Sequence, residues 1–236
     1  YYTVTAVYRS WTATSADSNP VSVGSDTTAP LVAVTTVNGS VRTFPFSTRS
    51  RVTSIGGTCG TAPGDSVTIS PLIDGAPTDP ATTSCTSGSW ELILSSRLSG
   101  NGTWTLSATQ DDAAGNTGIA PEQTLSIDRT RPTLSSIERA GSSESVNAGP
   151  LSWNVVFSEP VLGVSTSNFG LATSGVTGTP SLSSAEAAGG APSTTWTVIA
   201  DLDGVTGADA GSVGLDLTGR GSITDPANNR LRTSSF

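Results

Sequence analysis

Apolar and polar residues alternate with a period of two along most of this chain, which is the pattern of strands with one buried face. The apolar face of these segments is formed by Trp90, Leu92 and Leu94; Trp104, Leu106 and Ala108; Leu125 and Ile127; Leu151, Trp153, Val155 and Phe157; Trp196, Val198 and Ala200; and Val213, Leu215 and Leu217. No segment shows a sustained helical period. We therefore expect an all-β fold.

Turn-forming sequences separate these segments. They are NG at 38–39 and 101–102, APGD at 62–65 and SEP at 158–160, all rich in residues that favour tight turns. The Ala-rich stretch SSAEAAGGA at 183–191 is short and broken by Gly, so we expect it to be a loop.

The first stretch differs from the rest. Tyr2, Val4, Ala6 and Tyr8 alternate, and Val21 and Val23 close a second short strand. Two strands alone are marginally stable in water. We expect them to complete a domain or to dock on a neighbour.

Two motifs each occur twice. The motif D-x-T-x-P spans 26–30 and 128–132, about 100 residues apart, which is the length of one immunoglobulin-type domain. The motif D-x-A-x-N spans 112–116 and 225–229, near the end of each unit. The repeats predict units at 1–28, 29–128 and 129–236, the first of them incomplete.

Composition excludes several kinds of chemistry. The chain has 236 residues, a net charge of −8, and no His, Lys or Met. A Ser-His-Asp triad, His-ligated zinc, a Schiff-base lysine and a P-loop lysine are therefore impossible. The scattered arginines form no basic stripe, so we expect no nucleic-acid partner. No apolar run reaches the roughly 18 residues of a membrane span. The abrupt start leads us to expect a fragment of a longer exported protein.

The two cysteines, Cys59 and Cys85, predict a disulfide, because an even count is typical of exported chains. A loop of this size would stabilise the fold by about 3 kcal/mol in the chain-entropy model. Two buried free thiols are the alternative.

Several segments resemble bacterial surface-protein modules. Residues 1–23 resemble the last two strands of a fibronectin type III or related Ig-like module. GGTCGTAPGDSVTI (56–69), SGSWEL (87–92) and NGTWTLSATQDDAAGNTG (101–118) resemble a bacterial Ig-like domain, and so do WNVVFSEPVLGVSTSNFGL (153–171) and TDPANNRL (224–231). The resemblance implies tandem Ig-like Greek-key β-sandwiches. Lys–Asn isopeptide crosslinks, frequent in such families, are impossible in a chain without Lys.

The implied topology places the F–G and B–C loops at the pole where the preceding linker enters. At the first junction this gathers Asp26, Asp112 and Asn116, with Asp65 or Asp111 as further ligands; at the second it gathers Asp128, Glu159, Asp225 and Asn229. Calcium takes six to eight oxygen ligands. Each junction is thus a candidate calcium site. The alternative is that Asp and Asn only stabilise their own turns.

Other candidate sites are less specific. Asn38 and Asn101 fit the glycosylation acceptor pattern but also fit NG hairpin turns. Asp201 and Asp203 could form a carboxylate pair for glycoside hydrolysis, or simply open a turn. Trp11 could stack on a sugar.

We expect a non-catalytic structural or stalk segment of an exported cell-surface adhesin or extracellular fibre. Its partners would be neighbouring Ig-like domains of the same chain or of neighbouring subunits. One alternative is a carbohydrate- or host-binding accessory module of a secreted enzyme, which would bind surface glycans or host proteins. The other is a filament subunit that assembles by strand donation.

Overall fold

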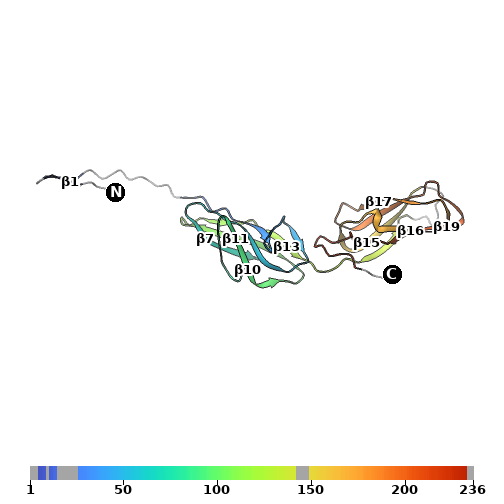
Figure 1. Cartoon of the computed structure of the whole chain (residues 1–236), viewed down its shortest axis with the longest axis horizontal. Coiled ribbons are helices and arrows are strands. Elements are labelled where there is room, and N and C mark those ends of the chain that lie inside the picture. The colour runs from blue at the N-terminus through green and yellow to red at the C-terminus, as the bar shows by residue number, and fades with distance from the viewer. Residues whose placement is uncertain (1–4, 9–10, 15–25, 142–148, 233–236) are drawn as a thin grey trace.

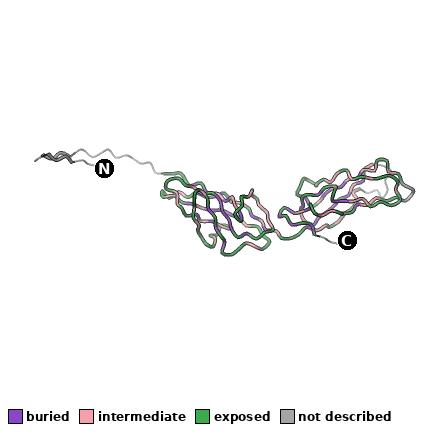
Figure 2. Tube along the Cα trace, viewed as in Figure 1, coloured by how far each residue is buried: buried purple, intermediate pink, exposed green. Residues whose placement is uncertain are grey.

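The computed structural model describes residues 5–8, 11–14, 26–141 and 149–232. Within these ranges the regular structure is β-strand, apart from one 3-10 turn, η1 (Thr166–Asn168). The all-β expectation is confirmed. Figure 1 shows two β units that follow one another along the long axis, and Figure 2 shows the buried residues running through the middle of each.

The first unit is built from two sheets. One sheet has the order β10 (Ser89–Leu98), β6 (Val52–Thr58), β3 (Ala33–Val37) and β4 (Ser40–Val41), all antiparallel. The other has the order β5 (Phe46–Thr48), β13 (Gln123–Ile127), β11 (Gly102–Asp112), β7 (Asp65–Ile73) and β8 (Ala76–Pro77), with β12 (Thr117–Ile119) on β11 and β9 (Thr83–Ser84) on β7. Both sheets contribute to one core, as in a β-sandwich.

The second unit has a separate core. Its main sheet has the order β14 (Leu134–Arg139), β15 (Leu151–Val161), β18 (Ser193–Asp201) and β17 (Ser181–Ala187), and β16 (Phe169–Thr177) pairs with β19 (Thr206–Leu217) as a long ribbon. Phe169 and Leu215 of the ribbon join Val155 and Val198 of the main sheet in this core. The buried residues of the first core all lie between 32 and 127, and those of the second between 151 and 231.

The period-two pattern explains which side chains form these cores. On β10, Trp90, Leu92 and Leu94 are buried, whereas the intervening Ile93 is 65% exposed. Alternate Cβ atoms of a strand point to opposite faces, so one face of β10 packs inward while the other meets solvent. Each fully buried aliphatic side chain contributes about 1.5–3 kcal/mol relative to an exposed one.

The disulfide is confirmed, with Cys59 bonded to Cys85 across a Cα–Cα distance of 6.0 Å. Cys59 follows the last residue of β6, and Cys85 follows the last residue of β9. The bond therefore ties the β9–β10 loop to the end of β6.

Three local expectations are wrong. The segment 183–191 is not a loop throughout, because Ser181–Ala187 forms β17, whose Leu182, Ala185 and Ala187 pack against the second core. SEP at 158–160 is not a turn but part of β15, whose register with β18 shifts between Val156 and Val161. NG at 101–102 joins β10 to β11, which belong to different sheets, so it closes no hairpin. NG at 38–39 does close the β3–β4 hairpin, with positive φ at both residues.

At the N-terminal end, β1 (Thr5–Tyr8) pairs antiparallel with β2 (Trp11–Thr14). The first expected strand overlaps β1, but its residues Tyr2 and Val4, and the expected second strand at 21–23, lie outside the described residues. The side chain of Trp11, the candidate for stacking on a sugar, likewise lies outside what the structure describes. In the described part of the chain, no helix is long and apolar enough to cross a membrane.

Candidate functional site

The two D-x-A-x-N segments fold into the same turn. The Oδ1 atom of Asp112 accepts a hydrogen bond from the backbone N–H of Asn116 at 2.8 Å, and Asp225 accepts the same bond from Asn229 at 2.8 Å. The fourth position has a left-handed backbone in both copies, with φ of 89° at Gly115 and 71° at Asn228. Gly and Asn are the residues that adopt this conformation most readily. The two copies of the sequence motif therefore adopt the same turn geometry.

The two D-x-T-x-P linkers also share one geometry. Asp26 Oδ1 accepts from the backbone N–H of Thr28 at 2.9 Å, and Asp128 Oδ1 accepts from that of Thr130 at 2.8 Å. These are Asx turns, in which the side chain replaces a backbone carbonyl as acceptor. Each linker therefore begins with a turn set by its own aspartate.

A single asparagine joins each D-x-A-x-N turn to the linker before its unit. The Nδ2 atom of Asn116 donates to the backbone carbonyl of Asp26 at 3.1 Å and to Oδ2 of Asp112 at 2.7 Å. The Nδ2 atom of Asn229 donates to the backbone carbonyl of Asp128 at 2.8 Å and to Oδ2 of Asp225 at 2.8 Å. We call this arrangement the Asp–Asn clamp. It brings together three of the residues that the sequence analysis expected at each junction: Asp26, Asp112 and Asn116 at the first, and Asp128, Asp225 and Asn229 at the second.

The second clamp is more deeply buried than the first. Asp225 is 2% exposed and Asn229 is 4% exposed, whereas Asp112 and Asn116 are half-buried and Asp26 is exposed. A hydrogen bond is worth more when its loss would leave a buried partner unsatisfied. The second clamp should therefore contribute more to stability than the first.

Glu159 lies beside the second clamp. One carboxylate oxygen from each of Asp128, Glu159 and Asp225 lies within 4.8 Å of the other two. The pKa of Glu159 is raised to about 7, mainly by burial, and also by the charges of Asp128 and Asp225 and by a side-chain hydrogen bond with Asp128. The Oε1 atom of Glu159 is buried and has no hydrogen-bond partner among the described residues.

Among the described residues, the first joint has no counterpart of Glu159. The two further ligands considered there are engaged elsewhere, since Asp65 Oδ2 accepts from the backbone of Ala62 at 2.9 Å and Asp111 Oδ1 accepts from Thr117 Oγ1 at 2.6 Å. Over residues 26–141 and 149–232, the three carboxylates of the second joint are the one group close enough to share a metal ion. At the first joint, the side-chain hydrogen bond from Asn116 helps to lower the pKa of Asp112.

The second joint is also held from the first unit, a feature that the sequence analysis missed. Asn101 Oδ1 accepts from the backbone N–H of Arg129 at 3.0 Å, and its Nδ2 donates to Thr130 Oγ1 at 2.8 Å. The backbone N–H of Arg49 donates directly to the carbonyl of Ala227 at 3.2 Å. In the sequence, Asn101 stood out only through its NG dipeptide and its glycosylation acceptor pattern, and neither predicts these bonds.

Both candidate glycosylation residues use their side-chain amides within the fold. Besides Asn101, Asn38 donates through Nδ2 to the carbonyl of Arg51 at 2.8 Å and accepts at Oδ1 from the backbone of Thr53 at 2.8 Å. This supports a structural role for both residues. Similarly, Asp201 Oδ1 accepts from the backbone of Asp203 at 3.0 Å, which supports the turn interpretation of that pair.

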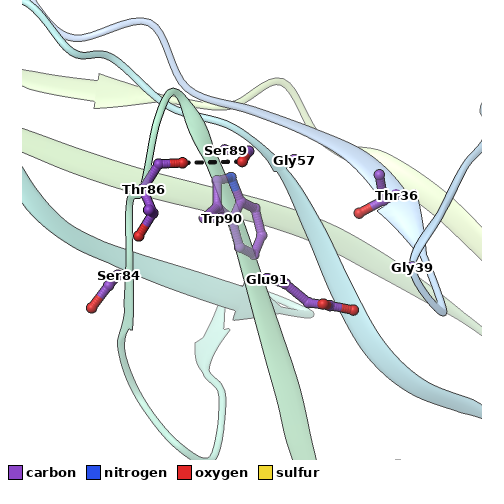
Figure 3. A pocket seen from close by; sticks show the side chains of 8 residues that line it. All are labelled: Thr36, Gly39, Gly57, Ser84, Thr86, Ser89, Trp90 and Glu91. Carbon is purple, nitrogen blue, oxygen red and sulfur yellow. Dashed lines mark hydrogen bonds between the residues drawn. The ribbon is translucent and has the colours of Figure 1, made fainter.

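A shallow surface pocket of about 350 Å³ lies over β6 and β10, lined by Thr36, Gly39, Gly57, Ser84, Thr86, Ser89, Trp90 and Glu91 (Figure 3). Trp90 is only 4% exposed, and its Nε1 donates to the carbonyls of Ala33 and Thr58. Trp153 and Trp196 are also buried, and Trp104 packs against the first core. None of these four rings forms an exposed platform for stacking on a sugar.

Comparison with known proteins gives no assignment. No protein-family model matches the chain, and no curated protein matches it significantly.

Proposed function

We propose that this chain is a rigid, non-catalytic spacer of tandem Ig-like sandwiches in an exported cell-surface or extracellular fibrous protein. The observation that carries the proposal is the Asp–Asn clamp, which occurs at both joints with the same hydrogen bonds. A clamp between a unit and its incoming linker restricts the angle between neighbouring units. Repetition of the clamp along a longer chain would give a stiff stalk.

Three further observations support this function. The second joint is bonded from both sides, because Asn101 holds the linker from the first unit while Asn229 holds it from the second. The disulfide supports an oxidising, extracellular location, where such bonds persist. Burial of Trp90, Trp153 and Trp196 leaves none of these three rings exposed for stacking on a sugar, which favours a spacer over a carbohydrate-binding module.

Residual dipolar couplings of the full chain test the rigidity of the second joint. In a rigid spacer, the couplings of the two units fit one common alignment tensor. Asn101→Ala removes the bonds to Arg129 and Thr130 from an exposed position, and should make the two tensors diverge. Asn228→Gly is the matched control, because it keeps the left-handed backbone of the turn. Independent alignment of the two wild-type units would contradict the proposal.

A further inference from the structure

The first unit grips the start of the second unit through three hydrogen bonds. Asn101, in the turn between β10 and β11, accepts from the backbone N–H of Arg129 at 3.0 Å and donates to Thr130 Oγ1 at 2.8 Å. The backbone N–H of Arg49 donates to the carbonyl of Ala227 at 3.2 Å. We call the two donor turns the exit end of a unit, and the linker with its D-x-A-x-N turn the entry end.

The entry end of the first unit carries the same three groups. By motif position, the groups bonded at the second joint have these counterparts at the first: the backbone N–H of Thr27 for Arg129, the hydroxyl of Thr28 for Thr130, and the carbonyl of Ala114 for Ala227. The hydroxyl belongs to threonine and the carbonyl to alanine in both copies. Every residue except proline offers a backbone N–H. The first entry end thus has every group that the exit end of a unit bonds.

The same hydrogen bonds fix the position of these groups at both joints. The Asx turn of Asp26 matches that of Asp128, with bonds of 2.9 and 2.8 Å to the backbone N–H two residues further on. The side-chain amides of Asn116 and Asn229 then tie each linker to its own turn. Linker and turn are held together alike in the two copies, so a surface that fits one entry end also fits the other.

The three groups of the first entry end have no partner in the part of the chain that the structure describes. No described residue bonds to the backbone N–H of Thr27, to Thr28 Oγ1 or to the carbonyl of Ala114. Ala114 is exposed, whereas Ala227, which accepts from Arg49, is only 3% exposed. The first entry end is therefore an uncovered copy of a surface that is covered at the second joint.

We propose that the entry end of the first unit docks the exit end of another unit of the same kind, with Thr27, Thr28 and Ala114 as the contact residues. The partner is a β unit that carries an asparagine amide and a backbone N–H placed like those of Asn101 and Arg49. The inference rests on the proposed function, because a spacer of clamped units requires that the exit end of each unit match the entry end of the next. One bond of the second joint has no equivalent: Arg129 Nη1 donates to the carbonyl of Ser99 at 3.4 Å, which the short side chain of Thr27 cannot reach.

A lengthened chain tests this docking directly. Residues 1–127 are followed by residues 26–236, so that the chain keeps every natural residue and the exit end of an upstream copy of the first unit meets the entry end of a downstream copy. Amide hydrogen exchange at Thr27 is the measurement. Exchange at Thr27 of the downstream copy should be at least about tenfold slower than in the natural chain, because the bond to Asn101 must open first.

Two variants of the lengthened chain assign the effect to its residues. Asn101→Ala in the upstream copy should remove the protection of the downstream Thr27 and leave that of Arg129. The same substitution in the downstream copy is the matched control and should do the reverse. Asn101 is exposed, so neither variant disturbs a core. Thr28→Val in the downstream copy removes the hydroxyl that accepts from the upstream Asn101 and should reduce the protection of Thr27.

The outcomes separate this inference from the proposed function. Equally fast exchange at Thr27 in the natural and lengthened chains, with Arg129 protected in both, would overturn the docking surface and leave the rigid second joint intact. Fast exchange at Arg129 as well would count against the spacer itself. Protection of the downstream Thr27 that survives Asn101→Ala in the upstream copy would overturn the assignment of Asn101 as the partner residue.

Discussion

Asn229 and Asp128 lie 101 residues apart in the sequence, yet the side-chain amide of Asn229 donates to the backbone carbonyl of Asp128 at 2.8 Å. Asn116 makes the equivalent bond to Asp26 over 90 residues. The repeated motifs are therefore more than local turns. In each repeat, an aspartate shapes the turn and an asparagine ties that turn to the linker before its unit.

Asn229→Ala should destabilise the second unit by about 1–3 kcal/mol, because it leaves the buried carboxylate of Asp225 short of a hydrogen bond. Asn116→Ala should cost the first unit less, since its clamp is only half-buried. Hydrogen exchange resolved by peptide measures both effects and assigns them to a unit. Equal losses in the two units would show that burial does not set the strength of the clamp.

In the presence of chelator, the stability of the second unit should fall as the pH rises from about 5 to about 7. The pKa of Glu159 is raised to about 7 in the folded chain, by burial and then by Asp128 and Asp225, from an ordinary value of 4.5. Because this pKa is higher in the folded state than in the unfolded state, the folded state keeps the proton of Glu159 to a higher pH. The stabilising contribution of the protonated Glu159 is therefore fully present below about pH 4.5 and is lost as the pH rises to about 7.

Thermal melts at several pH values, each in EDTA, measure this dependence. Glu159→Gln should flatten it, and Glu138→Gln, an exposed glutamate on β14, should leave it unchanged. The stability of the first unit should fall separately in acid, as the pH drops below about 3.8, because the pKa of Asp112 is lowered in the folded chain. A flat wild-type profile between pH 5 and 7 would contradict the environment assigned to Glu159.

Replacing both Cys59 and Cys85 by Ser should destabilise the first unit by about 3 kcal/mol, because the unfolded chain regains the freedom of the closed loop. The second unit has its own core and serves as an internal control. Urea unfolding followed by hydrogen exchange separates the two. Equal loss of protection in both units would mean that they unfold as one cooperative block.

Gly118→Ala should disturb the first joint. A Cβ atom at Gly118 would lie 1.9 Å from the carbonyl oxygen of Pro30, so the backbone of the linker must move. Overpacking of this kind costs about 1–3 kcal/mol or more. Gly100→Ala is the control, since no heavy atom lies within 4 Å of its added Cβ. A shift of the urea midpoint in Gly118→Ala alone would confirm the contact; similar midpoints in both variants would argue against it.

Features that depend on neighbouring residues in the chain could be predicted without the structure. Period-two alternation placed Trp90, Leu92 and Leu94 on the buried face of β10, because successive side chains of a strand point to opposite sides. The Asx turns at Asp26 and Asp128 could also be predicted from the sequence, since each carboxylate accepts a hydrogen bond from a backbone N–H only two residues away.

The contacts between distant segments could not be predicted in this way, because they depend on how the strands pair and pack. The carboxylates of Asp128, Glu159 and Asp225 come from three segments, and Glu159 lies where the register of β15 with β18 shifts between Val156 and Val161, which its sequence pattern does not reveal. The segment 183–191 looked like a loop because Ala and Gly dominate it, yet pairing with β18 makes its first part strand β17. Strand pairing and sheet packing set these long-range contacts, and local propensity has little influence on either.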